Sequence, residues 1–169
     1  MSKASRPVPA AVLPLRSAVR LYRRTRARMA LGLNCTIAND AVIGPRARWL
    51  SQGRVDIASR VFIGADFFVE TDLSVGPDVL ISSRVALVSD DHPFDSTSRR
   101  VTDHHRRPAS LVVIEGDNLI GHGTMILGPA VIGRGTIVGA GSLVIGDLPP
   151  DSICVGRPAR RIRGRRGAT

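Results

Sequence analysis

The sequence repeats with a period of six residues. An aliphatic residue stands at every sixth position in two unbroken runs, which are Ile57, Ile63, Val69, Val75, Ile81 and Leu87, and then Ile114, Ile120, Ile126, Ile132, Val138 and Val144. An α-helix cannot keep every sixth residue on one face, because six residues turn it through about 600°. Short strands joined by tight corners can do so, with each aliphatic side chain pointing inward.

Small or short polar residues recur between the aliphatic positions. They stand four residues after the repeat starts, at Asn118, Thr124, Ala130, Thr136 and Ser142. Coils of this kind, stacked about 4.8 Å apart, would pair their strands in parallel and align the aliphatic side chains into one interior column. Ile37 and Ile43 begin an earlier run that is offset by two residues, which predicts an insertion near residues 49–53.

The alternative is an α/β protein with short buried strands. It needs helices of about 10–15 residues, and Gly or Pro interrupts the repeat region too often for these. Aromatic residues make up only 4% of the chain, which suits thin stacked layers better than a sandwich whose sheets are about 10 Å apart. We therefore predict an all-β chain that forms a parallel β-helix.

One long interruption divides the two runs. Leu87 and Ile114 are 27 residues apart, which is not a multiple of six, and the sequence between them is polar, with His92, Pro93, Phe94 and Asp95 near its start. This predicts a loop that leaves the coil over residues 88–112, called the excursion loop below. Long loops on rigid scaffolds often carry the chemistry of a protein.

Positive charge is confined to the two ends of the chain. Residues 1–30 hold eight basic residues and 157–169 hold six, with no acidic residue in either segment, whereas 31–156 hold ten basic and fourteen acidic residues. We predict a basic N-terminal segment, helical over 11–29, then a β-helix domain and a basic tail. The mildly acidic body argues against a nucleic-acid partner. The N-terminal segment either caps the coil or contacts an anionic membrane surface or a partner.

The cysteines and the hydropathy pattern indicate the compartment. Cys35 and Cys154 lie far apart in the sequence and belong to no metal-type cluster, so neither a disulfide framework nor a zinc site is expected. No apolar run approaches the length of a membrane span, which needs about 20 residues. We expect a cytoplasmic protein, with the N-terminal segment as a candidate contact to the inner membrane surface.

Together these residues resemble the hexapeptide-repeat acyltransferases, especially the maltose, galactoside and nodulation-type sugar O-acetyltransferases. The resemblance covers about 57–163 and rests on the repeat, on His92-Pro93-Phe94-Asp95, on Gly139-Ala140-Gly141-Ser142, on Leu148-Pro149-Pro150 and on Gly156-Arg157-Pro158-Ala159-Arg160. It implies a left-handed coil and a homotrimer with active sites between subunits. It also implies transfer of an acetyl group from acetyl-CoA to a hydroxyl of a saccharide or glycoconjugate.

The resemblance also assigns roles to residues. It implies that His92 is the general base, a role that suits an imidazole, and that Asp95 orders the loop around it. The residues that it implies for coenzyme A are Ala140, Gly141 and Ser142 along the late coils, Pro158 near the adenine, and Arg160 and Arg163 at the phosphates, where guanidinium groups bind well.

The sequence departs from the family pattern at three places. Ile145-Gly146 replaces the usual Thr-Lys pair, and Leu119 replaces the tryptophan that often walls the sugar site. An asparagine-rich stretch is replaced by residues 66–72, where Glu70 or Asp72 is a candidate for holding the acceptor.

Two other function classes are open. A metalloenzyme like the γ-carbonic anhydrases would use His122, but no second histidine lies five residues away, at 117 or 127, so we expect no metal. A non-catalytic β-helix scaffold is the other alternative.

Overall fold

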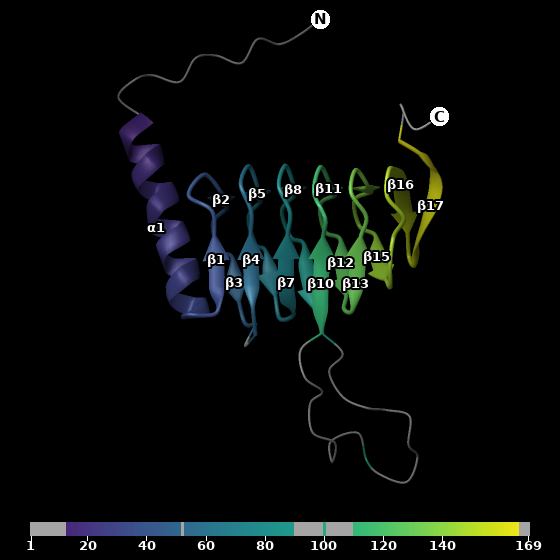
Figure 1. Cartoon of the computed structure of the whole chain (residues 1–169), viewed down its shortest axis with the longest axis horizontal. Coiled ribbons are helices and arrows are strands. Elements are labelled where there is room, and N and C mark those ends of the chain that lie inside the picture. The colour runs from purple at the N-terminus through teal and green to yellow at the C-terminus, as the bar shows by residue number, and fades with distance from the viewer. Residues whose placement is uncertain (1–12, 52, 90–99, 101–109, 166–169) are drawn as a thin grey trace, which may run out of the picture.

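The computed structural model describes residues 13–51, 53–89, 100 and 110–165, and these form a three-sided parallel β-helix (Figure 1). Face A consists of β1 (Cys35–Ile37), β4 (Val55–Ile57), β7 (Asp72–Val75), β10 (Leu111–Ile114) and β13 (Ala130–Ile132). Face B consists of β2 (Val42–Ile43), β5 (Phe62–Ile63), β8 (Leu80–Ile81), β11 (Leu119–Ile120), β14 (Ile137–Val138), β16 (Ser152–Gly156) and β17 (Ala159–Gly164). Face C consists of β3 (Arg48–Trp49), β6 (Phe68–Val69), β9 (Ala86–Val88), β12 (Met125–Leu127) and β15 (Leu143–Ile145).

The repeat builds the interior as predicted. Every aliphatic side chain of the two six-residue runs is 3% exposed or less. Parallel pairing places residues 18 apart in register, as in Ile114 with Ile132 and Ile57 with Val75. Each coil thus uses three six-residue units, one for each face, and its aliphatic side chains stack on those of the next coil. The fold class expected from the sequence, a left-handed parallel β-helix, is confirmed.

The predicted insertion is present in the first coil. Trp49 pairs with Val69, twenty residues later, whereas Val55 pairs with Leu73, eighteen residues later. Two additional residues therefore lie at the edge where the chain passes from face C to face A, between β3 and β4.

Arginine and aspartate side chains form ion pairs between successive coils along two edges. Arg60 contacts both carboxylate oxygens of Asp78, at 2.5 and 2.7 Å, on the edge between faces A and B. Arg46 contacts Asp66 in the same way, at 2.6 and 2.8 Å, on the edge between faces B and C. These guanidinium hydrogen bonds lower the pKa of Asp78 and of Asp66. Because the pairs are exposed to solvent, they add little to stability.

A single helix, α1 (Leu13–Leu31), precedes the first coil and begins and ends two residues later than predicted. It packs against β1, β2 and β3 and buries Ala27 and Leu31. Arg28 donates a 2.5 Å hydrogen bond to the carbonyl of Ile37, and Arg24 donates one to the carbonyl of Asn39. The helix therefore caps the coil, one of the two roles predicted for it. No helix among the described residues is long and apolar enough to cross a bilayer.

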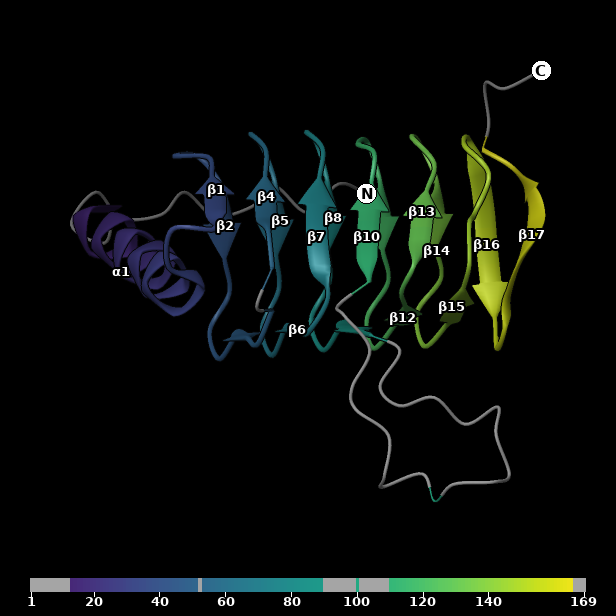
Figure 2. The ribbon, with the colours of Figure 1, turned by 60° about the horizontal axis from the view of Figure 1, so that its bottom comes forward.

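The C-terminal segment differs from the expected basic tail. β17 turns back and pairs antiparallel with β16, with Ile153 opposite Arg163 and Val155 opposite Arg160. Figure 2 shows α1 across one end of the coil and this hairpin at the other. The boundary placed after residue 156 thus falls inside a β-hairpin that continues face B.

Candidate functional site

Two serines join the ends of the excursion loop where it leaves the coil. β9 ends on face C at Val88, and β10 begins on face A at Leu111. Between them, the backbone N–H of Ser110 donates to Oγ of Ser89 at 3.1 Å, and the two hydroxyl oxygens are 3.4 Å apart. The base of the loop is therefore a closed neck at the edge between faces C and A. His92 and Asp95 lie outside the described residues.

The residues predicted to hold the acceptor lie beside this neck, one coil earlier. The N–H of Glu70 donates to the carbonyl of Leu87, and the N–H of Asp72 donates to the carbonyl of Ser110, each at 3.0 Å. The Asp72 carboxylate is partly exposed, and its Oδ1 atom lies 3.4 Å from the hydroxyl of Ser51. The structure thus brings Glu70 and Asp72 together at the base of the loop that carries the predicted base.

Sequence reasoning missed four residues at this edge. Besides the serines of the neck, Thr71 is fully buried, and its hydroxyl has no hydrogen-bond partner within the described part of the chain. Gly128, one coil later, also belongs here, since a Cβ atom on it would lie 2.3 Å from Oγ of Ser110. The serines on both sides of the polar insertion were the only sequence signal for the neck.

The strip predicted for coenzyme A lies on a different edge, between faces B and C. Ala140 and Gly141 form an exposed corner between β14 and β15, and Gly141 has φ of +68° with open space beside it. The N–H of Gly141 donates to the carbonyl of His122 at 2.7 Å. Ser142 is buried, and its hydroxyl donates to the carbonyl of Gly139 at 2.7 Å. The ligand-accessible part of this strip is therefore the backbone of Ala140 and Gly141.

Glycines let the coils approach closely behind this strip. A Cβ atom on Gly121 would lie 2.4 Å from the backbone nitrogen of Ala140. The glycines that directly follow the aliphatic positions, such as Gly121, leave room for the backbone of the next coil. Positive φ angles occur two residues later, at Gly123 and Gly141.

The basic residues predicted for the phosphates lie on the C-terminal hairpin. Pro158 occupies its turn, and Arg160 and Arg163 lie on β17, all three exposed. β16 pairs with β14, whose last residue precedes Gly139, so the hairpin continues the coil just beyond the Ala140–Gly141 corner. Neither arginine forms an ion pair with a carboxylate of the described residues, which leaves both guanidinium groups available to an anion.

Leu119 lies apart from both edges, on the outer surface of face B. It is 38% exposed and stands in a row of outward-facing side chains, one from each coil. In order along the coil the row is Val42, Phe62, Leu80, Leu119, Ile137 and Ile153. In a three-sided coil, face B is opposite the edge that carries the neck. Apart from Leu119, the predicted site residues within the described part of the chain therefore form two separate groups.

The repeat region of the chain is similar to known proteins. Residues 111–146 match the bacterial transferase hexapeptide (six repeats) family. Within these residues the chain is similar to that family. Galactoside O-acetyltransferase of Escherichia coli is 30% identical to it over 114 residues, which cover 62% of this chain and 54% of that one. The chain spans about half the length of the first curated relatives that it matches.

Solved structures share the fold. A hexapeptide-repeat acetyltransferase of Vibrio cholerae, complexed with acetyl-CoA, has a TM-score of 0.70 at 23% identity and covers 94% of this chain and 91% of its own. A polySia-specific acetyltransferase has a TM-score of 0.64 at 27% identity and covers 78% and 61%. An N-acyltransferase of Bacillus cereus, in complex with dTDP and coenzyme A, has a TM-score of 0.59 at 25% identity and covers 81% of both chains. The resemblance that the sequence motifs indicated is confirmed.

His122, the residue behind the metalloenzyme alternative, lies exposed on the edge between faces B and C. Its backbone carbonyl accepts a hydrogen bond from the N–H of Gly141. No group of three His, Cys, Asp or Glu side chains that could hold a metal ion occurs within residues 13–51, 53–89, 100 and 110–165.

Proposed function

We propose that the chain is an acetyl-CoA-dependent O-acetyltransferase that acts on a hydroxyl of a saccharide or glycoconjugate. The observation that carries the proposal is the exposed Ala140–Gly141 backbone beside a hairpin whose Arg160 and Arg163 have no carboxylate partner among the described residues. An extended ligand with an amide-rich arm and phosphates at one end needs this combination, because backbone groups pair with its amides and guanidinium groups with its phosphates. Coenzyme A and acetyl-CoA are present in the related structures named above.

In the proposed reaction, His92 accepts the proton of the acceptor hydroxyl while the oxygen attacks the thioester carbonyl. The tetrahedral intermediate then collapses, the carbon–sulfur bond breaks, and the imidazolium returns its proton to the leaving thiolate. The products are an acetyl ester and free coenzyme A. Asp95 positions the loop around His92, and Glu70 and Asp72 accept hydrogen bonds from other hydroxyls of the acceptor.

The proposal includes a homotrimer, because one chain holds its predicted site residues in two separate groups. Outward-facing apolar side chains line face B, and Met125 and Ile145 add to them on face C, where they are 37% and 54% exposed. Apolar rows of this length usually mark an interface. Packing between copies would bury them and bring the neck of one subunit toward the strip of its neighbour. Both cysteines are free thiols, and the proposal places the enzyme in the reducing cytoplasm.

The test is a thiol-release assay with acetyl-CoA and a panel of candidate acceptors. The panel should contain sugars, glycosides and amino sugars, with a no-acceptor reaction as the control for hydrolysis. Release that depends on a hydroxyl acceptor, with a matching acetyl ester found by mass spectrometry, is the expected result. An N-acetyl product from amino sugars alone would contradict the acceptor class. Light scattering that reports a monomer would contradict the shared site.

Replacing Gly121 with alanine is expected to weaken coenzyme A binding about tenfold, or ~1.4 kcal/mol. The added methyl group meets the backbone of Ala140 and must displace the strip, at an additional stability cost of about 1–3 kcal/mol. The matched control is Gly44→Ala, because its Cβ atom would lie 2.4 Å from the backbone carbon of Gly64, on the same edge of the first coil. Calorimetric titration should show weakened binding in Gly121→Ala only. Equal affinities of the two variants for coenzyme A would mean that the strip is not part of the binding site.

A further inference from the structure

We propose that the N-terminal end of the coil is a docking surface for a membrane that contains anionic phospholipid. The surface consists of the outer side of α1 and the arginine-lined cavity between α1 and the first coil. The inference does not depend on the transferase activity, because it concerns the opposite end of the coil from the C-terminal hairpin.

No acidic residue of α1 offsets the positive charge of the helix. The helix contains six arginines and no aspartate or glutamate. Arg24 and Arg28 donate to backbone carbonyls. None of the six forms an ion pair with a carboxylate among the residues that the structure describes. Uncompensated cations near an anionic bilayer are attracted to its surface potential, which makes lipid phosphate the matching partner.

The helix also exposes an apolar stripe on the side away from the coil. Leu21, Tyr22 and Met29 are 54%, 61% and 77% exposed, whereas Ala27 and Leu31 on the opposite side are buried. At 100° per residue the three exposed side chains fall on one side of the helix, with Arg26 on one flank and Arg28 on the other. Interfacial helices have this arrangement, because their apolar stripe enters the lipid while flanking arginines reach the headgroups.

A cavity of about 450 Å³ lies beside this stripe, between α1 and the edge that follows β2. Its lining includes Tyr22, Arg23 and Arg26 from the helix and Arg46, Arg48 and Trp49 from the first coil. Arg46 is already paired with Asp66.

The other three arginines of the cavity have no carboxylate partner among the described residues. Arg26 lies over the Tyr22 ring at 6.0 Å, and Arg48 over the Phe68 ring at 5.4 Å. The cavity can therefore receive a lipid phosphate. Because Tyr22 belongs to both the cavity and the stripe, a lipid bound in the cavity would have its acyl chains beside the stripe.

Vesicle co-sedimentation of the full chain tests this proposal. The expected result is binding to vesicles that contain phosphatidylglycerol and little binding to pure phosphatidylcholine vesicles. The double variant Arg26→Gln with Arg48→Gln should weaken binding about 25-fold, since each arginine near the surface contributes about fivefold. Arg157→Gln with Arg161→Gln is the matched control, because it removes the same charge at the far end of the coil and should bind like the unmodified chain. Leu21→Ser with Met29→Ser should weaken binding without a change in charge.

Several results would overturn the proposal. They are equal sedimentation with neutral and anionic vesicles, no sedimentation with either, and an equal loss of binding in the far-end control. A change of oligomeric mass in the Leu21 and Met29 variant, with lipid binding intact, would assign the stripe to a second copy of the chain. Circular dichroism checks that each variant is folded. Added salt should release the unmodified chain, a test that needs no substitution.

Discussion

Replacing His92 with alanine is expected to lower the rate of acetyl transfer by about 10²–10⁴-fold, the range over which a positioned acid–base group contributes to a rate. Without the imidazole, the acceptor hydroxyl must lose its proton to water while it attacks the thioester. The measurement is acceptor-dependent thiol release under saturating acetyl-CoA. Binding of coenzyme A should be unchanged, because its expected site is on the edge between faces B and C and on the C-terminal hairpin.

The matched control is His104→Ala, which removes another histidine from the same excursion loop. Its rate should stay within about twofold of the unmodified enzyme, because no step of the proposed reaction uses this imidazole. If His92→Ala keeps its turnover, the general base is another group. If both variants lose activity together, the loop acts as a whole and His92 has no separate chemical role.

The coil could be predicted from the sequence because the same residue type recurs at its inward-facing positions. Each six-residue unit places one aliphatic side chain inward, so Ile114 and Ile132 can be assigned to one column without knowing the rest of the fold. The same logic located the two additional residues of the first coil. In a repeat structure each unit contacts only its neighbours, so local spacing carries most of the topology.

The C-terminal hairpin could not be predicted in the same way. Arg160, Arg161 and Arg163 give β17 no alternation of apolar and polar residues, and its main-chain partners come from β16. The strand is defined by tertiary pairing, which overrides weak β-propensity. The charge of this segment indicated a tail, whereas the free edge of face B makes it a strand.

The sequence indicates a set of candidate site residues but not how these residues are arranged. The positions of Asp72 and Gly141 in the sequence do not say which edge of the coil each occupies. Nor does the sequence reveal that Ser89 and Ser110, 21 residues apart, hydrogen-bond to each other. Glu70 and Asp72 are beside the neck because parallel stacking places the 70–72 corner directly against the start of β10.

The second large effect is expected at Asn118, whose replacement by alanine should lower the free energy of unfolding by about 2–4 kcal/mol. Asn118 is 3% exposed, and its side chain bridges two coils. Its Oδ1 atom accepts from the N–H of Gly116 at 2.8 Å, and its Nδ2 group donates to the carbonyls of Gly133 at 2.7 Å and Thr136 at 3.1 Å.

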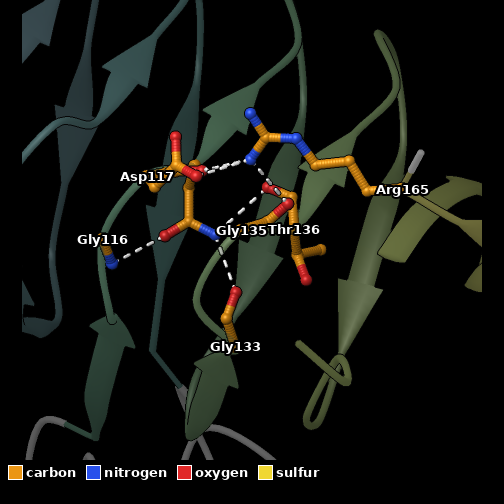
Figure 3. Close-up of polar contacts among 7 residues, drawn as sticks. Gly116, Asp117, Gly133, Gly135, Thr136 and Arg165 are labelled. Carbon is orange, nitrogen blue, oxygen red and sulfur yellow. Dashed lines mark hydrogen bonds and ion pairs between the residues drawn. The ribbon is translucent and has the colours of Figure 1, made fainter. Parts of the chain in front are cut away.

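These three hydrogen bonds contribute unequally to the free energy of unfolding. The carbonyls of Gly133 and Thr136 also accept backbone hydrogen bonds, from Thr136 and Leu119 respectively. The N–H of Gly116 is different, because its residue is buried and Asn118 is the acceptor that the structure gives it. A buried donor without an acceptor carries its full desolvation cost, about 1–3 kcal/mol, which is the largest part of the expected loss. Figure 3 shows Arg165 reaching the same corner from the far side, through Asp117 and the carbonyl of Gly135.

Thr124→Ala is the matched control for Asn118→Ala, because Thr124 occupies the equivalent position on the next edge of the coil. Its hydroxyl makes one long hydrogen bond, 3.3 Å to the carbonyl of Gly139, so the loss should be about 1 kcal/mol. Thermal unfolding at one protein concentration, since assembly would shift the midpoint, should place the Asn118 variant several degrees below the Thr124 variant. Equal midpoints would mean that water replaces the amide at Gly116, and the corner would then be held by backbone hydrogen bonds and by Arg165 instead.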